Sequence, residues 1–365
     1  MTILTVVAGS SSLHLAYVRD GRVTDRLDRS EPPGTAGADE PTREFIAGHE
    51  PPRAVGHRLV HGGDLVTAPT PVDDRLRTAL DGLTTLAPLH LPPALHLLDA
   101  IRGQLPDVPQ VLCPDTAFHA DLPEQAATYP LPAPWRERWG LRRYGFHGLS
   151  YAYALGRAAD LLGRPAAELS LVLAHLGGGA SVCAVRDGRS VDTSMGFTPL
   201  DGVPMTRRSG AVDPGLLLWL LDGRLDRDEL DDGLNHRSGL LGLSGGRSDD
   251  TRDLVAAAPD DPAAALAMAV YIHRVRRELA AAATSLDRLD GIVFTGEIGW
   301  DQPEVRDGVC AGLGLLGVVP PGGGNRDTDA VVSAPGARVP VLVVEPREEL
   351  QVAVETAAAL AGGAS

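Results

Sequence analysis

The sequence predicts an α/β protein made of two similar lobes, and three observations lead to this fold class. The chain has 365 residues, 44% of them hydrophobic, which is too long for one compact core. Residues 2–27 and 169–191 repeat one plan: an apolar strand, a Gly/Ser turn, an alternating strand and an Asp-Gly turn. A buried strand followed by a glycine-containing loop lies near residue 290, an arrangement common in nucleotide sites.

The elements follow in chain order from turn residues and hydrophobic spacing. Each repeat predicts a β-hairpin, and the tip of the first is rich in hydroxyl and N–H groups. Residues 262–283 have few helix breakers and apolar residues at helical spacing, so they predict a helix. The segment LDGIVFTGEIG (289–299) predicts the later strand and loop, and residues 348–361 predict a closing helix. Two Pro/Gly-rich stretches, 29–41 and 319–326, predict surface loops.

Composition excludes several classes of protein. The formal net charge of −15 disfavours binding to nucleic acid or to an anionic membrane surface. The chain contains no lysine, so all 33 residues of the Lys+Arg total are arginines. Walker A loops, pyridoxal Schiff bases and Ser-x-x-Lys acyl enzymes all need that amine. An anionic ligand must therefore be held by guanidinium, imidazole, backbone N–H groups or a metal.

Cysteine usage and hydropathy predict a soluble, cytoplasmic protein. Cys113, Cys183 and Cys310 are far apart in sequence and match no metal-ligand spacing, so we expect buried free thiols. No run of about 18 apolar residues is present, and the N-terminal strand lacks the basic region of a signal peptide.

Ten short motifs are spread over nearly the whole chain. They are AGSSSL (8–13), GHRLVHGG (56–63), LAPLHLPPAL (86–95), DTAFH (115–119), YGFHGLSY (144–151), HLGGGAS (175–181), VDTSMGFTPLDG (191–202), RSGAVDPG (208–215), SGLLGLSG (238–245) and EEL (348–350). In this order they closely resemble the acetate kinase family. The resemblance implies the duplicated, ribonuclease H-like fold of actin-like ATPases, with ATP in a cleft between the lobes. It places the first lobe at residues 1–119 plus 348–365 and the second at 120–347.

The resemblance also implies phosphoryl transfer between ATP and a short carboxylate. Both reactants are anionic, so the enzyme must cancel repulsion and stabilise charge on the moving phosphoryl group. By motif position, Arg58 and Arg208 match the active-site arginines of the family. His147 matches the histidine that stabilises the transition state, and His90 one that positions the phosphoryl group. Outside these motifs, each would be read as a surface charge or a structural histidine.

The acceptor is expected to be acetate or propionate. The methyl group of the acceptor binds against a small apolar surface that excludes water, and this burial stabilises binding by only about 1 kcal/mol. The family builds this wall from positions that match Val60, Leu89, Phe146 and Pro199, all apolar here. One methylene separates the two acceptors, and such a pocket discriminates weakly between them.

The metal and donor positions depart from the family in part. Asp115 and Glu348 match acidic residues around Mg²⁺, which prefers oxygen ligands. Val7 replaces an asparagine that organises the metal and Asp115, and His14 replaces a phosphate-contacting lysine. Ser10 and Ser12 remain in the first Gly/Ser turn. In the second turn, His175, Gly177, Gly178 and Gly179 are able to cradle phosphate, although Gly178 replaces an asparagine.

The third donor element is altered most. Gly296, Glu297, Ile298 and Gly299 stand where relatives have Ala-Gly-Ile-Gly, so a carboxylate replaces a glycine beside the expected adenosine. Either Glu297 obstructs adenosine or it turns to solvent or to a ribose hydroxyl. Asp250 and Arg252 resemble another adenosine-contacting motif and favour a surviving nucleotide site.

Three functions therefore stay open. The first is a Mg²⁺-dependent kinase that uses ATP/ADP and interconverts acetate or propionate with its acyl phosphate. The second uses pyrophosphate or another donor, and the third is a weakly active paralogue that binds acyl phosphate. By resemblance we also expect lobe closure during turnover and a homodimer.

Overall fold

The computed structural model describes residues 1–9, 12–31 and 33–362, which form two compact units. Unit 1 contains Met1–Ala120, Phe146–Tyr153 and Arg347–Ser365, and unit 2 contains Asp121–Gly145 and Ala154–Pro346. One segment differs from the expected division, because Phe146–Tyr153, with His147, belongs to unit 1.

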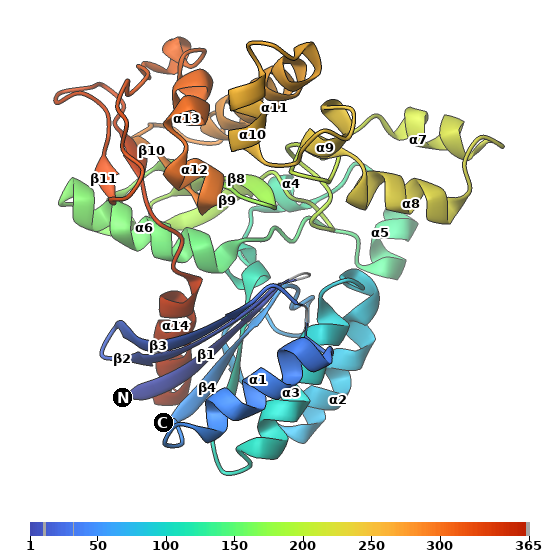
Figure 1. Cartoon of the computed structure of the whole chain (residues 1–365), viewed down its shortest axis with the longest axis vertical. Helices are drawn as coiled ribbons and strands as arrows, with labels where there is room; N and C mark the ends of the chain where they lie inside the picture. Colours follow the sequence, from blue (N-terminus) through green and yellow to red (C-terminus); the bar gives the residue numbers. More distant parts are fainter. Residues whose placement is uncertain (10–11, 32, 363–365) are drawn as a thin grey trace. The chain divides into compact units, whose positions relative to one another are not determined.

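Unit 1 is built on a six-stranded mixed sheet with the order β3-β2-β1-β4-β6-β5 (Figure 1). The strands are β1 Thr2–Ala8, β2 Leu13–Arg19, β3 Arg22–Arg29, β4 Ala54–Leu59, β5 Thr70–Pro71 and β6 Gln110–Pro114. The first three strands are antiparallel, as the hairpin pattern predicts, whereas β1, β4 and β6 run parallel. Parallel strands end at the same edge, so residues that follow β4 and β6 lie near one another.

Unit 2 repeats this sheet strand for strand, with the order β11-β12-β10-β7-β8-β9. The strands are β7 Leu171–Leu176, β8 Ala180–Arg186, β9 Arg189–Thr193, β10 Gly291–Thr295, β11 Ala330–Val331 and β12 Val341–Val343. Strands β7 to β9 are antiparallel, β7, β10 and β12 are parallel, and β11 is antiparallel to β12. The predicted duplication is confirmed by this identical order and direction.

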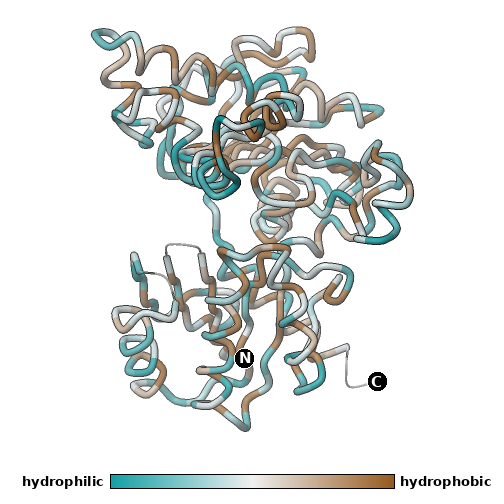
Figure 2. The backbone as a smooth tube through the Cα atoms, turned by 90° about the vertical axis from the view of Figure 1, so that its right-hand side faces the viewer, coloured by the Kyte–Doolittle hydropathy of each residue, from teal (hydrophilic) through white to brown (hydrophobic). Residues whose placement is uncertain are grey.

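Alternation along β1 distributes the core of unit 1 over both faces of the sheet. Leu4, Val6 and Ala8 pack with α1 and α3, whereas Ile3 packs with Ala353 of α14. The helices of unit 1 are α1 Ala36–Ala47, α2 Asp74–Leu80, α3 Leu91–Gln104 and α14 Glu348–Gly362, with 3₁₀ turns at Asp81–Leu86 and Asp115–His119. In Figure 2, hydrophobic residues are brown and hydrophilic residues are teal, and both colours occur along the chain in each unit.

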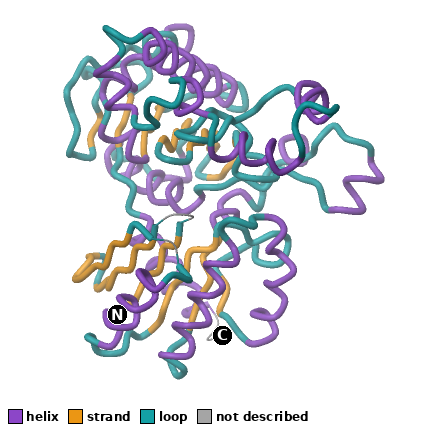
Figure 3. Tube along the Cα trace, turned by 45° about the vertical axis from the view of Figure 1, so that its right-hand side comes forward, coloured by secondary structure: helices purple, strands orange, loops and turns teal. Residues whose placement is uncertain are grey.

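Most helices belong to unit 2, and α6 Gly148–Leu162 begins in unit 1 and continues into unit 2 (Figure 3). The others are α4 Glu124–Ala127, α5 Ala133–Trp139, α7 Pro214–Leu221, α8 Arg227–His236, α9 Gly239–Leu243, α10 Thr251–Ala257, α11 Pro262–Ala283, α12 Gly296–Asp301 and α13 Pro303–Cys310, with 3₁₀ turns at Ala166–Glu168 and Gly314–Leu316. The predicted helix at 262–283 is confirmed as α11, which packs on β7 and β8.

The loop prediction for residues 29–41 is wrong in its second half, where α1 begins at Ala36. Its buried residues Ala38, Thr42 and Ile46 recur every four positions, so one stripe of the helix packs on the core despite Pro41. The described part of 319–326 has no regular structure, and all three cysteines are buried free thiols, as predicted. Among the described residues, no helix is long and apolar enough to cross a membrane.

Candidate active site

The centre of the candidate site in unit 1 is a guanidinium shared by two carboxylates. Arg58, near the end of β4, donates from Nη2 to Asp115 Oδ2 at 2.8 Å and from Nε to both oxygens at 3.3 Å. Its Nη1 lies 3.2 Å from Glu348 Oε2 at the first turn of α14. Asp115 directly follows β6, so the parallel pairing of β4 and β6 brings these two side chains together. The two sides of the guanidinium thus hold carboxylates from segments 233 residues apart in sequence (348 − 115 = 233).

This cluster is buried, and its charges stabilise one another. Asp115 is only 1% exposed, and the side chains of Arg58 and Glu348 are 15% and 14% exposed. Burial opposes the charge of Arg58, but Asp115 and Glu348 more than offset burial and raise the pKa of the guanidinium. An arginine with one carboxylate on each side is expected to stay protonated throughout the physiological range.

The two carboxylates fit the oxygen-ligand preference of Mg²⁺. No three His, Cys, Asp or Glu side chains of the described residues are grouped so that they could hold a metal by themselves. Mg²⁺ is commonly held by only one or two carboxylates, together with water and substrate phosphates. Asp115 and Glu348 therefore suit a metal that arrives with a phosphorylated substrate.

The His147 segment is held against the DTAFH motif (115–119) by two close contacts, one with Asp115 and one with His119. A Cβ at Gly148 would lie 2.0 Å from the Asp115 carbonyl oxygen, so only glycine permits this approach. The His119 ring donates from Nε2 to the Phe146 carbonyl at 3.1 Å, and burial lowers the pKa of His119 to about 4. His147 itself has φ of 60°, an uncommon conformation for a residue other than glycine. The DTAFH and YGFHGLSY motifs thus form one rigid unit, and sequence analysis assigned no role to His119 or Gly148.

The acceptor residues divide between the two units. Val60 and Phe146 are buried in unit 1, and the Phe146 ring packs edge-on against His61 with centroids 5.3 Å apart. Leu89, at 42% exposed, does not form part of a dry interior in unit 1, and the half-buried His90 precedes α3. Pro199 lies in unit 2 on the irregular segment after β9.

Val7 and His14 lie on the two strands that flank the first Gly/Ser turn. Val7 is buried among apolar residues, including Cys113 and Val352, and has become part of the core. His14 is exposed on β2 and pairs with Asp28 at 2.7 Å, so its ring faces a carboxylate. Ser12 is half-buried and its carbonyl accepts from the Gly9 N–H, whereas Ser10 lies outside the described residues.

In unit 2, the glycine turn, the arginine loop and the third donor element lie together. Gly178 accepts hydrogen bonds from the N–H and hydroxyl of Thr206, two residues before Arg208. A Cβ on Gly177 would approach His175 Nε2 at 3.5 Å and the Glu297 nitrogen at 3.7 Å. The glycine turn thus contacts both the arginine loop and the third donor element, and a turn of this kind can bind phosphate through its N–H groups.

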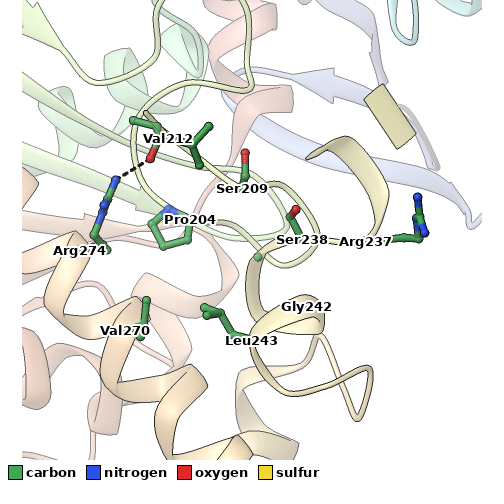
Figure 4. Close-up of a pocket in the computed structure, with 11 residues that line it drawn as sticks. Pro204, Ser209, Val212, Arg237, Ser238, Gly242, Leu243, Val270 and Arg274 are labelled. Atoms are coloured by element: carbon green, nitrogen blue, oxygen red, sulfur yellow. Dashed lines mark hydrogen bonds between the residues drawn. The ribbon is translucent and has the colours of Figure 1, made fainter. Parts of the chain in front are cut away.

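The loop that carries Arg208 is held from two sides. Met205 N–H donates to the Arg208 carbonyl at 3.0 Å, and Arg274 of α11 donates to the Ala211 carbonyl at 2.8 Å (Figure 4). Burial lowers the pKa of the Arg208 guanidinium. A cavity of about 320 Å³ adjoins the loop and is lined by Pro204, Ser209, Ala211, Val212, Arg237, Ser238, Gly239, Gly242, Leu243, Val270 and Arg274.

The third donor element forms a charged group around Arg252. Glu297 is exposed at the start of α12. Gly296, which precedes it, has φ of 77°, and a Cβ at this position would collide with the backbone of Leu176. Arg252 forms an ion pair with Asp301. The hydrogen bond to Asp301 is the largest cause that raises the pKa of Arg252, and the negative charge of Glu297 raises it further. Asp250 caps α10 by accepting from the Arg252 N–H at 2.7 Å. Ile298 and Gly299 are buried.

A buried carboxyl on α14, Glu355, was not found by sequence analysis. Its Oε1 accepts from Gln351 at 3.1 Å, and its Oε2 is buried. Burial raises the pKa of Glu355 to about 7, and the charge of Asp115 contributes, while hydrogen bonds with Gln351 and Cys113 oppose the shift. Glu355 lies two helical turns after Glu348, so the two side chains lie on the same face of α14. This spacing is the signal by which the sequence points to Glu355.

Replacing Glu355 by glutamine is expected to stabilise the protein at pH 8 by on the order of 1–3 kcal/mol. The folded-state pKa lies above the ordinary 4.5, so ionisation penalises folding increasingly as pH rises from about 4.5 to about 7. The gain should shrink to a few tenths of a kcal/mol near pH 4.5, where the carboxyl is protonated in the folded state and about half protonated in the unfolded state. Denaturant unfolding at both pH values measures it, with exposed Glu44→Gln as the control. An equal gain at both pH values would contradict this assignment.

Known proteins resemble this chain over most of its length. The model of the acetokinase family matches residues 44–354. Acetate kinases of Synechococcus sp. (strain JA-2-3B'a(2-13)) and Clavibacter michiganensis subsp. michiganensis (strain NCPPB 382) are each 46% identical, over 82% and 86% of this chain and 74% and 80% of their own lengths.

Solved structures agree over the full fold. The acetate kinase of Porphyromonas gingivalis superposes with a TM-score of 0.88 at 32% identity, and a propionate kinase of Francisella tularensis with 0.88 at 30%. Each comparison covers 98% of this chain and 99% of the other. The predicted two-lobed actin-like fold is thereby confirmed, and the chain belongs to the acetokinase family.

Proposed function

We propose that this protein is a kinase that transfers a phosphoryl group between ATP and acetate or propionate, with Mg²⁺, and forms or consumes the acyl phosphate. The observation that carries the proposal is the Arg58 guanidinium held by Asp115 and Glu348, with the His147 segment fastened to the Asp115 backbone. This arrangement supplies fixed positive charge, oxygen ligands and an imidazole within one unit.

Each residue has a distinct part in direct in-line transfer. Arg58 and Arg208 offset the charge of the carboxylate and of the moving phosphoryl oxygens, and His147 donates a hydrogen bond to those oxygens. His90 orients the phosphoryl group, and Val60, Leu89, Phe146 and Pro199 are the apolar residues that we assign to the alkyl group of the acceptor. Mg²⁺ at Asp115 and Glu348 would neutralise charge on the donor phosphates. The glycine turn at 177–179 would bind those phosphates through its N–H groups.

Pyrophosphate is the second candidate donor, because Glu297 places a carboxylate side chain where relatives have a glycine beside the expected adenosine. Arg252, of the other adenosine motif, is already paired with Asp301. The exposed position of Glu297 supports ATP instead, because the side chain is not packed into the interior of unit 2.

An acyl phosphate trapping assay tests the proposal. Purified protein is incubated with acetate or propionate, Mg²⁺ and either ATP or pyrophosphate, and acyl phosphate is captured as the hydroxamate. We expect product with ATP, abolished by chelating the metal. Product with pyrophosphate alone would select the second donor, and no product with any donor would refute an enzymatic role.

We also propose that the protein is a cytoplasmic homodimer that self-associates through α7. This helix, PGLLLWLL, exposes four large apolar side chains, Leu216, Leu218, Trp219 and Leu221, of which Leu218 is 70% exposed. An apolar patch of this kind is typical of an interaction surface. We expect sedimentation to give the mass of two chains and Leu218→Glu to give that of one. A wild-type monomer at micromolar concentration would contradict the proposal.

A further inference from the structure

The segment that carries Pro199 has no regular structure of its own, and one side chain holds both of its ends. It runs from Ser194, after β9, to Asp201. Arg143 donates from Nη1 to the Ser194 carbonyl at 3.1 Å and to Asp201 Oδ2 at 3.4 Å. A single guanidinium thus closes the loop, and the arginine side chain is only 21% exposed.

The middle of this loop is held by Tyr129, which itself packs under Arg143. The Phe197 N–H donates to the Tyr129 hydroxyl at 2.7 Å, and the Arg143 guanidinium lies 5.6 Å from the Tyr129 ring centroid. A Cβ at Gly196 would lie 2.0 Å from that hydroxyl and 2.6 Å from Asp201 Oδ2. The backbone at Gly196 therefore packs directly against the Tyr129 and Asp201 side chains, so no residue larger than glycine fits there without displacing them.

The same loop is tied to the residues that lead into Phe146. The Gly196 carbonyl accepts from the N–H groups of Tyr144 at 3.1 Å and Gly145 at 3.4 Å, and the Tyr144 and Phe197 rings lie 6.0 Å apart. Gly145 immediately precedes Phe146 in the chain. Arg143 thus holds the Pro199 loop, and this loop holds Tyr144 and Gly145 by hydrogen bonds. These two residues precede Phe146 in the chain.

We propose that Arg143 is a positioning residue that sets the size of the carboxylate this protein accepts. The inference rests on the proposed function, because Pro199 acts as an acceptor wall only in that reaction. Discrimination of one methylene is worth about 10- to 200-fold in a rigid apolar pocket and is lost when a wall moves. Arg143 reaches the acceptor through the loop, and its own role is to hold Pro199 in place.

Replacing Arg143 by glutamine tests this role with acetate, propionate and butyrate. We expect the KM for acetate to rise about tenfold and kcat to stay within about threefold of wild type. A displaced Pro199 weakens binding of the acceptor more than it weakens the stabilisation of charge on the transferring phosphoryl group. The kcat/KM ratio of butyrate to acetate should rise about tenfold. Arg143→Lys, which cannot fork onto both loop ends, should give intermediate values.

Arg138→Gln is the matched control, because Arg138 also stacks on an aromatic ring, Trp139, but makes no bond to the loop. It should leave all three acceptors unchanged. If Arg143→Gln does not fold by circular dichroism, Tyr129→Phe removes only the hydroxyl that holds Phe197 and should shift the same ratio. Unaltered acceptor ratios in folded variants of an active wild-type protein would overturn the inference alone. Absence of wild-type activity would refute the proposed function instead.

Discussion

Replacing Arg208 by alanine is expected to lower kcat/KM for acyl phosphate formation about a thousandfold, with thermal stability nearly unchanged. The guanidinium is partly buried, and burial lowers its pKa, so its charge is poorly screened by water. A weakly screened positive charge contributes most where negative charge develops on the transferring phosphoryl oxygens. Steady-state kinetics by hydroxamate trapping, with a melting curve for each variant, measures both effects.

Arg207 provides an adjacent control for that experiment. It is 58% exposed and pairs with Asp249 at 2.5 Å, so Arg207→Ala removes the same charge one residue away. Its kcat/KM should stay within about threefold of wild type, because exposed charges are screened. Equal losses for the two variants would show that the electrostatic field of the loop matters rather than Arg208 itself.

Replacing Arg58 by alanine should damage both activity and folding. Its removal leaves Asp115, 1% exposed, and Glu348 without the cation that they share. Breaking a buried ion pair in this way costs about 3–5 kcal/mol of stability. Activity should fall about a thousandfold or more, because the acceptor carboxylate also loses its counter-charge. Denaturant unfolding and the trapping assay report the two losses separately.

The stability loss should be relieved when the two carboxylates are neutralised, which distinguishes it from a packing defect. Replacing Asp115 by asparagine and Glu348 by glutamine removes the repulsion that Arg58 normally offsets, so Arg58→Ala should cost less stability in that background than in the wild type. Arg53→Ala, at the exposed residue before β4, is the control and should behave as wild type. An equal loss in both backgrounds would mean that Arg58 acts through packing alone.

Acetate-type chemistry was predictable because short motifs occur along the chain in the order typical of the family. Motif order identified Arg58, Asp115 and Glu348, and the repeated strand-turn-strand plan predicted the duplicated fold. These features are local, because strand alternation and Gly/Ser turns are encoded over a few residues. The start of α1 at Ala36 was missed because the Pro/Gly content of 29–41 outweighed its stripe of buried residues.

Which groups face one another was decided by tertiary structure. Arg58 binds both Asp115 and Glu348 because β4 and β6 are parallel neighbours and Gly56, whose Cβ would meet Thr356 at 2.1 Å, lets α14 pack onto β4. The same packing buries Glu355 and raises its pKa to about 7, whereas His14 pairs with Asp28 across β2 and β3.

The sequence by itself determined the family, the duplicated hairpins and the residue types of a phosphotransferase. Only the tertiary structure decided that the His147 segment belongs with Asp115 and that Arg143 closes the Pro199 loop. The physical reason is that strand periodicity acts over neighbouring residues, whereas ion pairs and close glycine contacts depend on sheet order and on the distance between backbones.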